Sequence, residues 1–377
     1  MENLTHSLLG ATFAELALPA AATPAQRRLF FTVGVIAANL PDADLLYTRI
    51  TAPPLGYLLH HRGHTHTLVG IVVQAAIVGV ICMLPAIRSR VGTARTRFWT
   101  LISVALLSHL LADSWNSYGV HPFWPLDNRW LYGDAIYILE PWLWLLLGIA
   151  AALNAHRSRA RLLLGALLAG LVVTAFVANA ITTSAAVALT IGGATLALVM
   201  SKLASRQRSM LALALASSFV ATMFGVSRVV ESRVVAASSL GAGDEIVDVI
   251  LNPQPANPVC WSALSIVKNE RADRYVMTRG SIRLSSLARC GMRGDAGVEW
   301  DDTTTQALGA IRTLDRTDCR VSAWLQFGRA PLIGDGELGD LRFGGRARGN
   351  FTSMPLRSGD ACPSKLTNWS QPRADLL

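Results

Sequence analysis

The sequence predicts an all-α polytopic transmembrane bundle of about seven to eight helices, followed by a C-terminal β-rich soluble domain. Two observations predict the bundle. Apolar runs of bilayer-spanning length recur between residues 67 and 230, and hydrophobic residues make up 51% of the 377-residue chain against 16% for charged residues. A third observation predicts the soluble domain, because the chain beyond residue 240 is polar and carries short alternating runs typical of strands.

The first expected helix covers residues 4–18 and is marginal for a full span, since its fifteen residues rise only about 22 Å. The second is expected over 29–47, the third after His66, and the fourth over 98–113. Four more are expected at 135–155, 162–182, 184–203 and 209–229. Strands are expected at Trp261–Val267, Tyr275–Leu284 and Val321–Phe327.

The net charge of +9 is a topology signal. Twelve basic residues gather in four short loops, at 27–28, 88–97, 157–161 and 202–208. The positive-inside rule places these loops in the cytoplasm. We therefore expect no nucleic-acid partner and a multi-pass protein of a bacterial-type inner membrane.

Three parts are expected along the chain. Residues 1–155 form a membrane-embedded helical domain with a metal site, 156–231 form additional transmembrane helices, and 232–377 form an external, periplasmic β-rich domain. Four cysteines in the last part suit an oxidising compartment and are expected to form disulfides, in any of three pairings. These cysteines are Cys260, Cys290, Cys319 and Cys362.

Histidines and aspartates follow a pattern typical of metal ligands. Seven of the eight histidines precede residue 122, each near the end of an apolar segment. His109 and Asp113 are one helical turn apart, so both side chains can face one point. With the basic loops inside, the segments around His6, Asp42 and Asp44, His60 to His66, and His109 all reach the external face. Imidazoles and carboxylates together suit zinc or a similar divalent ion.

Five segments of the chain resemble the YdjM-like family of predicted membrane-bound metal-dependent hydrolases. They read THSLLG at 5–10, PDAD at 41–44, HRGHTHT at 61–67, HLLAD at 109–113, and YG at 118–119 followed by WP at 124–125. The segment DLRFG at 340–344 also looks like one found late in longer relatives. His64 stands where relatives usually have a bulky apolar residue, and Glu140-Pro141 stands where they often have Asp-Pro.

The resemblance implies a divalent-metal site, with zinc as the expected metal and one or two ions. The implied ligands are His6, Asp42, Asp44, His61, His66, His109 and Asp113. The order of these residues is more distantly similar to the zinc-dependent phospholipase C and P1 nuclease group, which hydrolyses phosphodiesters. The implied activity is hydrolysis of an ester or phosphoester in a membrane lipid or lipid-linked molecule, with water activated by the metal.

Further residues have expected roles that the sequence leaves open. Asp44 or Glu140 is expected to act as the base. Arg62 either pairs with a substrate phosphate through its planar fork or extends to lipid headgroups. His60 and His64 compete with His61 and His66 as ligands.

Two other functional classes remain. A metal-ion transporter would need polar groups along a path near the membrane midplane, whereas the expected ligands gather at one face. A scaffold or binding protein would hold a structural metal in a closed site, whereas a hydrolase needs an open coordination position.

Overall fold

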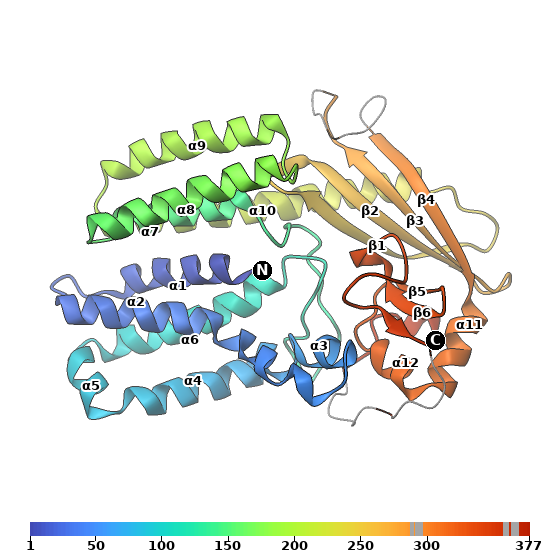
Figure 1. Ribbon diagram of the computed structural model, residues 1–377, viewed down its shortest axis with the longest axis horizontal. Helices are drawn as coiled ribbons and strands as arrows, with labels where there is room; N and C mark the ends of the chain where they lie inside the picture. The colour runs from blue at the N-terminus through green and yellow to red at the C-terminus, as the bar shows by residue number, and fades with distance from the viewer. Residues whose placement is uncertain (287–289, 291–296, 357–361, 363–368) are drawn as a thin grey trace.

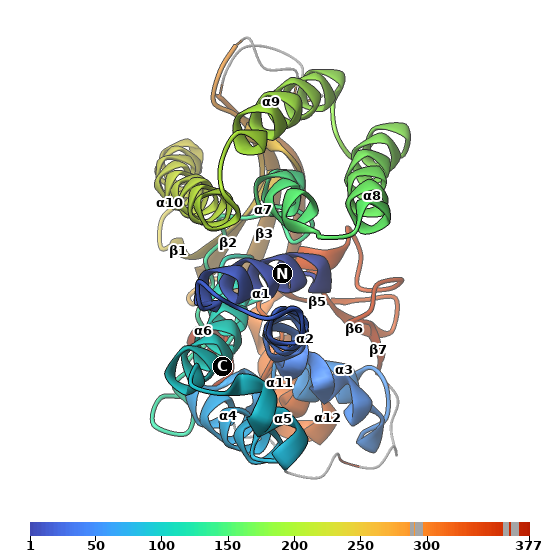
Figure 2. The ribbon, with the colours of Figure 1, turned by 90° about the vertical axis from the view of Figure 1, so that its left-hand side faces the viewer.

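The computed structural model describes residues 1–377 apart from 287–289, 291–296, 357–361 and 363–368. Helices occupy one end of the molecule and a mixed domain of strands and short helices occupies the other (Figure 1). Viewed along their axes, the helices form two groups, with α1 (Asn3–Ala17) between them (Figure 2). Helix α1 contacts members of both groups and joins them.

The first group packs closely around α1. It contains α2 (Pro24–Asn39), α4 (Leu68–Cys82), α5 (Pro85–Val91) and α6 (Arg95–Asp113). Helices α1 and α2 meet at Gly10 and Gly34, where a Cβ on Gly10 would lie 2.3 Å from the Gly34 carbonyl oxygen. The absence of side chains at these two positions lets the backbones touch.

Short helical turns connect α2 to α4 at the end of the bundle that faces the mixed domain. They are the 3-10 helices η1 (Leu40–Leu46), η2 (Thr48–Ile50) and η3 (His64–His66) and the α-helix α3 (Leu55–His60). The single helix expected over 29–47 is therefore wrong. Helix α2 ends at Asn39 because Pro41 lacks the N–H that an α-helix needs there, and the chain continues as a 3-10 helix.

The second group consists of four helices, and three of them are long. They are α7 (Pro141–Asn154), α8 (Ser158–Val177), α9 (Thr183–Ser201) and α10 (Ser205–Ala237). Helices α8 and α9 leave most of their apolar side chains on the outside, including Leu162, Val177 and Ile191. Such exposed apolar faces are typical of helices in contact with lipid.

The expectation of seven to eight spans is wrong. Among the described residues, four helical segments are long and apolar enough to cross a membrane, or five if the bent pair Leu55–His66 and Leu68–Cys82 makes one span. Helices α1, α4 and α7 have only 15, 15 and 14 residues, which rise about 20 Å against a hydrocarbon thickness of about 30 Å. Apolar composition alone therefore overcounted the spans.

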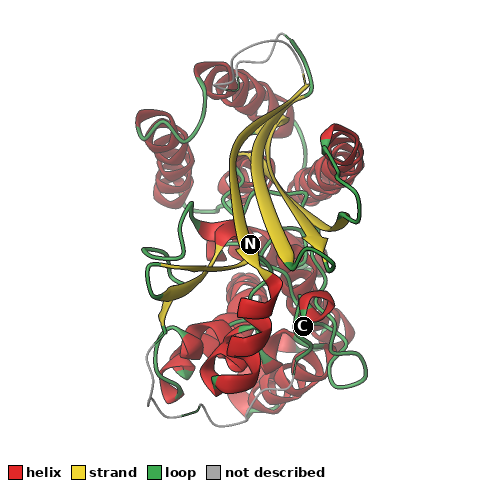
Figure 3. Ribbon diagram, turned by 90° about the vertical axis from the view of Figure 1, so that its right-hand side faces the viewer, coloured by secondary structure: helices red, strands yellow, loops and turns green. Residues whose placement is uncertain are grey.

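The C-terminal domain contains two antiparallel sheets. The larger has the order β1-β2-β3-β4 and is seen face-on in Figure 3; its strands are Glu245–Gln254, Asn257–Asn269, Arg274–Arg283 and Gly297–Ala307. The smaller contains β5 (Pro331–Gly334), β6 (Glu337–Asp340) and β7 (Met354–Pro355). In the sequence, α11 (Leu308–Thr317) and α12 (Cys319–Trp324) follow the larger sheet and precede the smaller one. Two short 3-10 helices, η4 (Leu341–Phe343) and η5 (Ala374–Leu376), complete the domain.

Strands β1 and β2 of the larger sheet are buried on both faces because their side chains alternate between two cores, whereas β4 has no buried residue. Leu251 and Ala263 pack with the second helical group, whereas Ile250, Leu264 and Ile266 pack with the C-terminal core. The strands expected around Trp261 and Tyr275 are β2 and β3. The strand expected at Val321–Phe327 is wrong, because most of that segment belongs to α12, whose first turn is capped by the Asp318 side chain.

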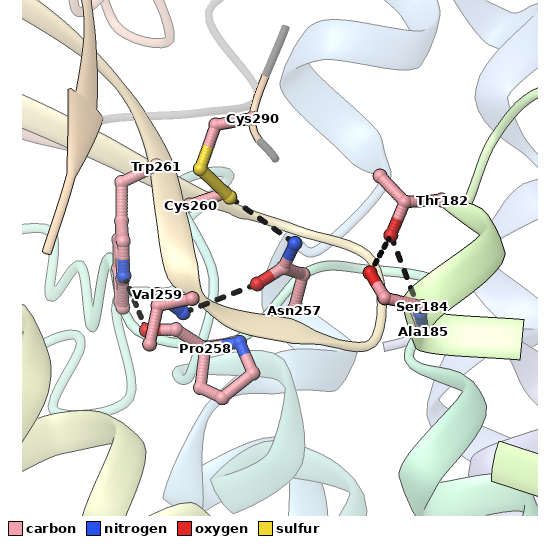
Figure 4. The surroundings of a disulfide bond; sticks show 9 residues. All are labelled: Thr182, Ser184, Ala185, Asn257, Pro258, Val259, Cys260, Trp261 and Cys290. Carbon is pink, nitrogen blue, oxygen red and sulfur yellow. Dashed lines mark hydrogen bonds between the residues drawn. A yellow bond between two sulfur atoms is a disulfide. The ribbon is translucent and has the colours of Figure 1, made fainter. Parts of the chain in front are cut away.

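The four cysteines of the domain form two disulfides, as the sequence predicts. Cys260 pairs with Cys290 and Cys319 with Cys362, with Cα atoms 5.5 and 5.7 Å apart. The amide of Asn257 donates to Cys260 Sγ at 3.1 Å, at the turn that begins β2 (Figure 4). Three of the basic loops lie at the end of the helices opposite to this domain (Figure 1).

Candidate metal centre

Two overlapping groups of ligand-type side chains lie where the first helical group meets the C-terminal domain. The first group is Asp42, His66, His109 and Asp113, and the second is Asp42, Asp44 and His61. Within each group the ligand atoms lie within 4.8 Å of one another. Side chains from η1, η3 and α6 therefore converge, although up to 71 positions separate them in the sequence.

Each histidine of the first group is oriented through its Nδ1 atom. His109 Nδ1 donates to the Ala38 carbonyl at 2.7 Å, and His66 Nδ1 lies 3.1 Å from Asp44 Oδ2. A carbonyl or carboxylate oxygen can only accept, so each Nδ1 carries a proton and Nε2 is the nitrogen whose lone pair can bind a metal. These two Nε2 atoms lie 3.0 Å apart.

In each aspartate of the first group, one carboxylate oxygen accepts a hydrogen bond and the other faces the histidines. Asn3 donates to Asp42 Oδ2 at 2.8 Å, and Arg62 Nη2 donates to Asp113 Oδ1 at 3.0 Å. The other oxygens face His66 Nε2, with Asp42 Oδ1 at 3.4 Å and Asp113 Oδ2 at 3.3 Å. Two carboxylate oxygens and two imidazole nitrogens thus converge on one point.

This donor set fits a divalent ion. Two lone pairs 3.0 Å apart beside two carboxylate oxygens repel one another unless a cation or a proton lies between them. Two nitrogens and two oxygens form a set that zinc accepts in proteins, and the hydrogen bonds at the other side of each ligand are the outer-shell contacts that such sites need. The residues present can therefore hold a divalent metal.

Asp44 is buried and has its oxygens occupied by donors. Its Oδ2 accepts from the backbone N–H of Arg62 at 3.0 Å and from the Thr65 hydroxyl at 2.8 Å, and its Oδ1 lies 3.0 Å from His61 Nδ1. The side chain of Asp44 is 0% exposed. Asp44 therefore orients both His61 and His66, besides belonging to the second group.

Arg62 is buried, which excludes the expected extension to lipid headgroups. Besides Asp113 Oδ1, it donates to the carbonyls of Asp113 and Gly119, at 3.1 and 3.2 Å. The guanidinium lies 4.4 Å from the centre of the Tyr118 ring. Arg62 thus connects the chain before α4 to the end of α6.

His6 lies against the first group without belonging to it. Its ring stacks on His109 with centroids 3.7 Å apart, and its Nε2 lies 3.3 Å from Asp113 Oδ1. The amino group of Met1 also contacts Asp113 Oδ1. His6 therefore packs beside the convergence point as an outer neighbour of His109 and Asp113.

Two histidines that competed as ligands lie outside both groups. His60 Nε2 lies 2.9 Å from the Thr51 hydroxyl, and the His64 ring has its edge to Trp124 and Trp369. His121 stacks on Trp369 at 4.2 Å, and its burial lowers its pKa to about 3.

Glu140, one of the two expected bases, lies outside both groups. It caps α7 by accepting from the Trp142 N–H at 3.1 Å, and it accepts from the Ala256 N–H at 3.4 Å. Burial raises the pKa of Glu140 to about 8, although these two N–H groups oppose that shift. Glu140 thus connects α7 to the turn between β1 and β2.

Access to the two groups is uneven. The side chains of His61 and Asp42 are each 12% exposed, whereas Asp44, His66, His109 and Asp113 are at most 1% exposed. A molecule outside the bundle would therefore meet the metal groups first at His61 and Asp42.

The C-terminal domain holds the loop that follows α6. Arg342, on η4, is buried and donates to the Ser117 carbonyl at 2.9 Å and to Asp340 Oδ2 at 2.7 Å. Sequence reasoning singled out the segment 340–344 but gave Arg342 no role. It also missed the Ala38 carbonyl, since a backbone acceptor leaves no signal in the sequence.

A comparison with known protein families covers the part of the chain that holds the His/Asp groups. The model of the YdjM inner membrane protein family matches residues 1–185. This part of the chain belongs to the YdjM-like family. The match includes all members of both metal groups and all of α8, and it ends in the first turn of α9, before α10 and the C-terminal domain.

Two curated relatives are similar to parts of this chain. The inner membrane protein YbcI of Escherichia coli (strain K12) is 38% identical over 105 residues, which are 27% of this chain and 56% of the relative. The uncharacterized protein YfhP of Bacillus subtilis (strain 168) is 24% identical over 149 residues, which are 38% of this chain and 43% of the relative. The chain thus matches about half the length of these relatives. No solved structure matches it.

Proposed function

We propose that this protein is a membrane-bound, metal-dependent hydrolase that acts on an ester or phosphoester of a lipid or lipid-linked molecule. The observation that carries the proposal is the convergence of two carboxylate oxygens and two imidazole lone pairs whose other atoms are all held by hydrogen bonds. Zinc is the proposed metal, and the second group offers room for a second ion.

A bound divalent ion would supply Lewis acidity, polarising an ester or phosphoryl oxygen and lowering the pKa of water. The protein residues contribute the rest. Asp44 and Ala38 hold the imidazoles in one tautomer, and Arg62 holds Asp113 with its second oxygen toward His66. Fixed ligands of this kind need no rearrangement during the reaction.

Three carboxylates are candidates for the base. Asp44 is surrounded by donors, which favours an orienting role, and Glu140 makes its hydrogen bonds at the start of α7. Asp42 combines partial exposure with an oxygen that faces the ligands, so it is well placed to orient a water molecule.

The difference in exposure among the candidate ligands favours a hydrolase over a scaffold with a structural metal. A structural site is closed by protein ligands, whereas a catalytic site keeps one position for water or substrate. The 12% exposure of His61 and Asp42 supports such a position.

We also propose that the C-terminal domain is periplasmic. Three basic loops lie at the end opposite to this domain, and the positive-inside rule assigns such loops to the cytoplasm (Figure 1). In a Cys82→Ser background, Ser89→Cys should react with an impermeant maleimide only in inverted vesicles, and Ser239→Cys only in intact spheroplasts. The opposite pattern would place the metal centre on the cytoplasmic side.

The hydrolase proposal is tested by purified protein loaded with zinc, manganese or magnesium and given phospholipids labelled in the headgroup or in one acyl chain. We expect release of one labelled fragment, which stops when the metal is chelated. A loaded protein that cleaves none of these lipids would contradict lipid hydrolysis.

A further inference from the structure

A cavity of about 650 Å³ lies next to the accessible side of the metal groups. Tyr57 lines this cavity, and its ring centroid lies 4.9 Å from that of His61. His61 in turn lies 3.0 Å from Asp44 Oδ1. One aromatic side chain thus separates the cavity from the second metal group. The volume falls within the range of about 300–1,000 Å³ that is usual for small-molecule sites.

The walls of the cavity come from two distant parts of the chain. Pro53, Pro54 and Tyr57 precede or belong to α3, and Phe351, Ser353 and Pro355 lie at β7 or just before it. The Tyr57 and Phe351 rings meet edge to face, 5.6 Å apart. The family match covers the first wall and not the second. The C-terminal domain therefore completes a cavity that the YdjM-like part forms only in half.

The lining of the cavity suits a hydrocarbon rather than a polar group. Three of the six lining residues are prolines, which have no N–H to donate, and two are aromatic. The Ser353 hydroxyl donates to the Ala347 carbonyl at 2.7 Å and accepts from the Asn350 N–H at 3.1 Å. The phenol of Tyr57 is the other hydroxyl of the lining. Because the Ser353 hydroxyl is already engaged within the protein and the remaining lining residues are proline and phenylalanine, the cavity favours an apolar ligand.

An exposed apolar segment lies in the sequence between Asp44, a member of the second metal group, and Pro53, the first residue of the cavity wall. Leu46 and Ile50, on η1 and η2, are 85% and 66% exposed. This segment is the end of the apolar stretch Pro24–Ile50, which is long enough to cross a membrane. Exposed apolar side chains at the end of such a stretch are in contact with lipid. This exposed apolar segment ends three positions before Pro53, the first residue of the cavity wall.

We propose that this cavity binds one hydrocarbon chain of the lipid substrate and leaves the ester linkage beside His61 and Asp42. The inference rests on the proposed function, to which it adds the binding site and the source of selectivity. In this arrangement Phe351, from the C-terminal domain, limits the length of the chain that fits. Proteins with the YdjM-like part alone would lack this limit.

Photolabelling tests the binding site without requiring hydrolysis. The full-length protein is placed in nanodiscs of phosphatidylethanolamine and phosphatidylglycerol that contain a phospholipid with a diazirine near the end of one acyl chain. After irradiation, we expect labelled peptides that contain residues 53–57 and 351–355, in addition to the lipid-facing helices. Labelling confined to the lipid-facing helices would overturn the proposal.

Variants distinguish lipid binding in the cavity from metal binding at the two His/Asp groups. Phe351→Arg should lower labelling of the 53–57 peptide by about tenfold, because a charge in an apolar cavity is unfavourable. Leu126→Arg is the matched control, since Leu126 is 96% exposed and does not line the cavity. His109→Ala, which removes a metal ligand, should leave the labelling unchanged.

A second variant keeps the test valid if Phe351→Arg fails to fold. Phe351→Trp narrows the cavity conservatively and should shift labelling toward shorter acyl chains, whereas an unchanged chain-length profile would contradict the proposal. Labelling at both walls without any hydrolysis would support the cavity and reject the proposed function. Hydrolysis without labelling at the walls would support the proposed function and reject the cavity as the binding site of the lipid chain.

Discussion

His109 Nδ1 donates to the carbonyl oxygen of Ala38 at 2.7 Å, and this bond joins α6 to the last turn of α2. The bond fixes the tautomer of His109 and points its Nε2 toward His66, Asp42 and Asp113. The orientation of a ligand on one helix thus depends on where the neighbouring helix ends.

Removing a ligand of the first group should remove bound metal. We expect His109→Ala and Asp113→Ala each to reduce the zinc content of the purified protein severalfold or more, because three ligands bind zinc far less tightly than four. Elemental analysis measures this content. His156→Ala, in an exposed loop at the other end of the bundle, should keep the parental value. Full metal retention in both ligand variants would refute the assignment.

Asp44 should control metal affinity by orienting the histidines. Asp44→Ala removes the acceptor for the Nδ1 atoms of His61 and His66, and outer-shell changes of this kind typically cost about 10–100-fold in affinity. Competition with a chromogenic chelator gives the affinity. Asp44→Asn keeps one acceptor oxygen and should show a smaller loss, whereas equal losses in the two variants would argue for a direct ligand.

Glu140 should make stability fall as the pH rises. Its pKa is about 8 in the folded protein against an ordinary 4.5, so between these values the folded state binds more protons than the unfolded state. The contribution of Glu140 to the free energy of unfolding is therefore greatest below about pH 4.5, decreases toward pH 8, and stays constant above it.

The control for this pH dependence is Glu140→Gln, which cannot ionise. The variant should show a smaller decrease in unfolding temperature between pH 5 and pH 8, measured by thermal scans in detergent. Parallel curves for the variant and the parent would show that Glu140 does not carry the effect.

Arg342 should be needed for the attachment of the C-terminal domain. Arg342→Met leaves Asp340 buried without its ionic partner, and such a loss typically costs about 3–5 kcal/mol. Arg348→Met is the matched control, because Arg348 is 72% exposed and its ion pair with Glu337 contributes at most about 1 kcal/mol. Denaturant unfolding followed by Trp fluorescence compares the two variants. Similar midpoints would contradict the role of Arg342.

The sequence singled out most of the residues that converge in the two His/Asp groups, because ligand-type side chains follow a local pattern. The spacing of His109 and Asp113, the PDAD segment and the histidines of 60–66 all pointed to one site. The sequence could not choose among the four histidines at 60–66, since they fall on two short helices and the turn between them, where no simple periodicity applies. It also left Arg62 open, because only the folded structure shows the guanidinium buried against Asp113.

The number of membrane spans was overestimated for a different reason. Segments such as 4–18 are apolar enough for a bilayer, but in the structure they are buried against other helices: Leu8, Leu9 and Ala14 of α1 are covered by protein. Hydropathy does not distinguish burial in protein from burial in lipid. The strand expected at 321–327 failed because a side-chain cap at Asp318 favours a helical turn over an extended run.

Helix α10 runs without a break from the second helical group to the larger sheet. Its 33 residues make a rod about 50 Å long, whereas the hydrocarbon layer is about 30 Å thick. The charged residues Arg228, Glu231 and Arg233 lie near its C-terminal end, where a bilayer-spanning segment would be expected to leave the hydrocarbon. The remaining turns reach the sheet as an unbroken continuation of a membrane helix. The sheet is therefore joined to the second helical group by one continuous helix and not by a flexible linker.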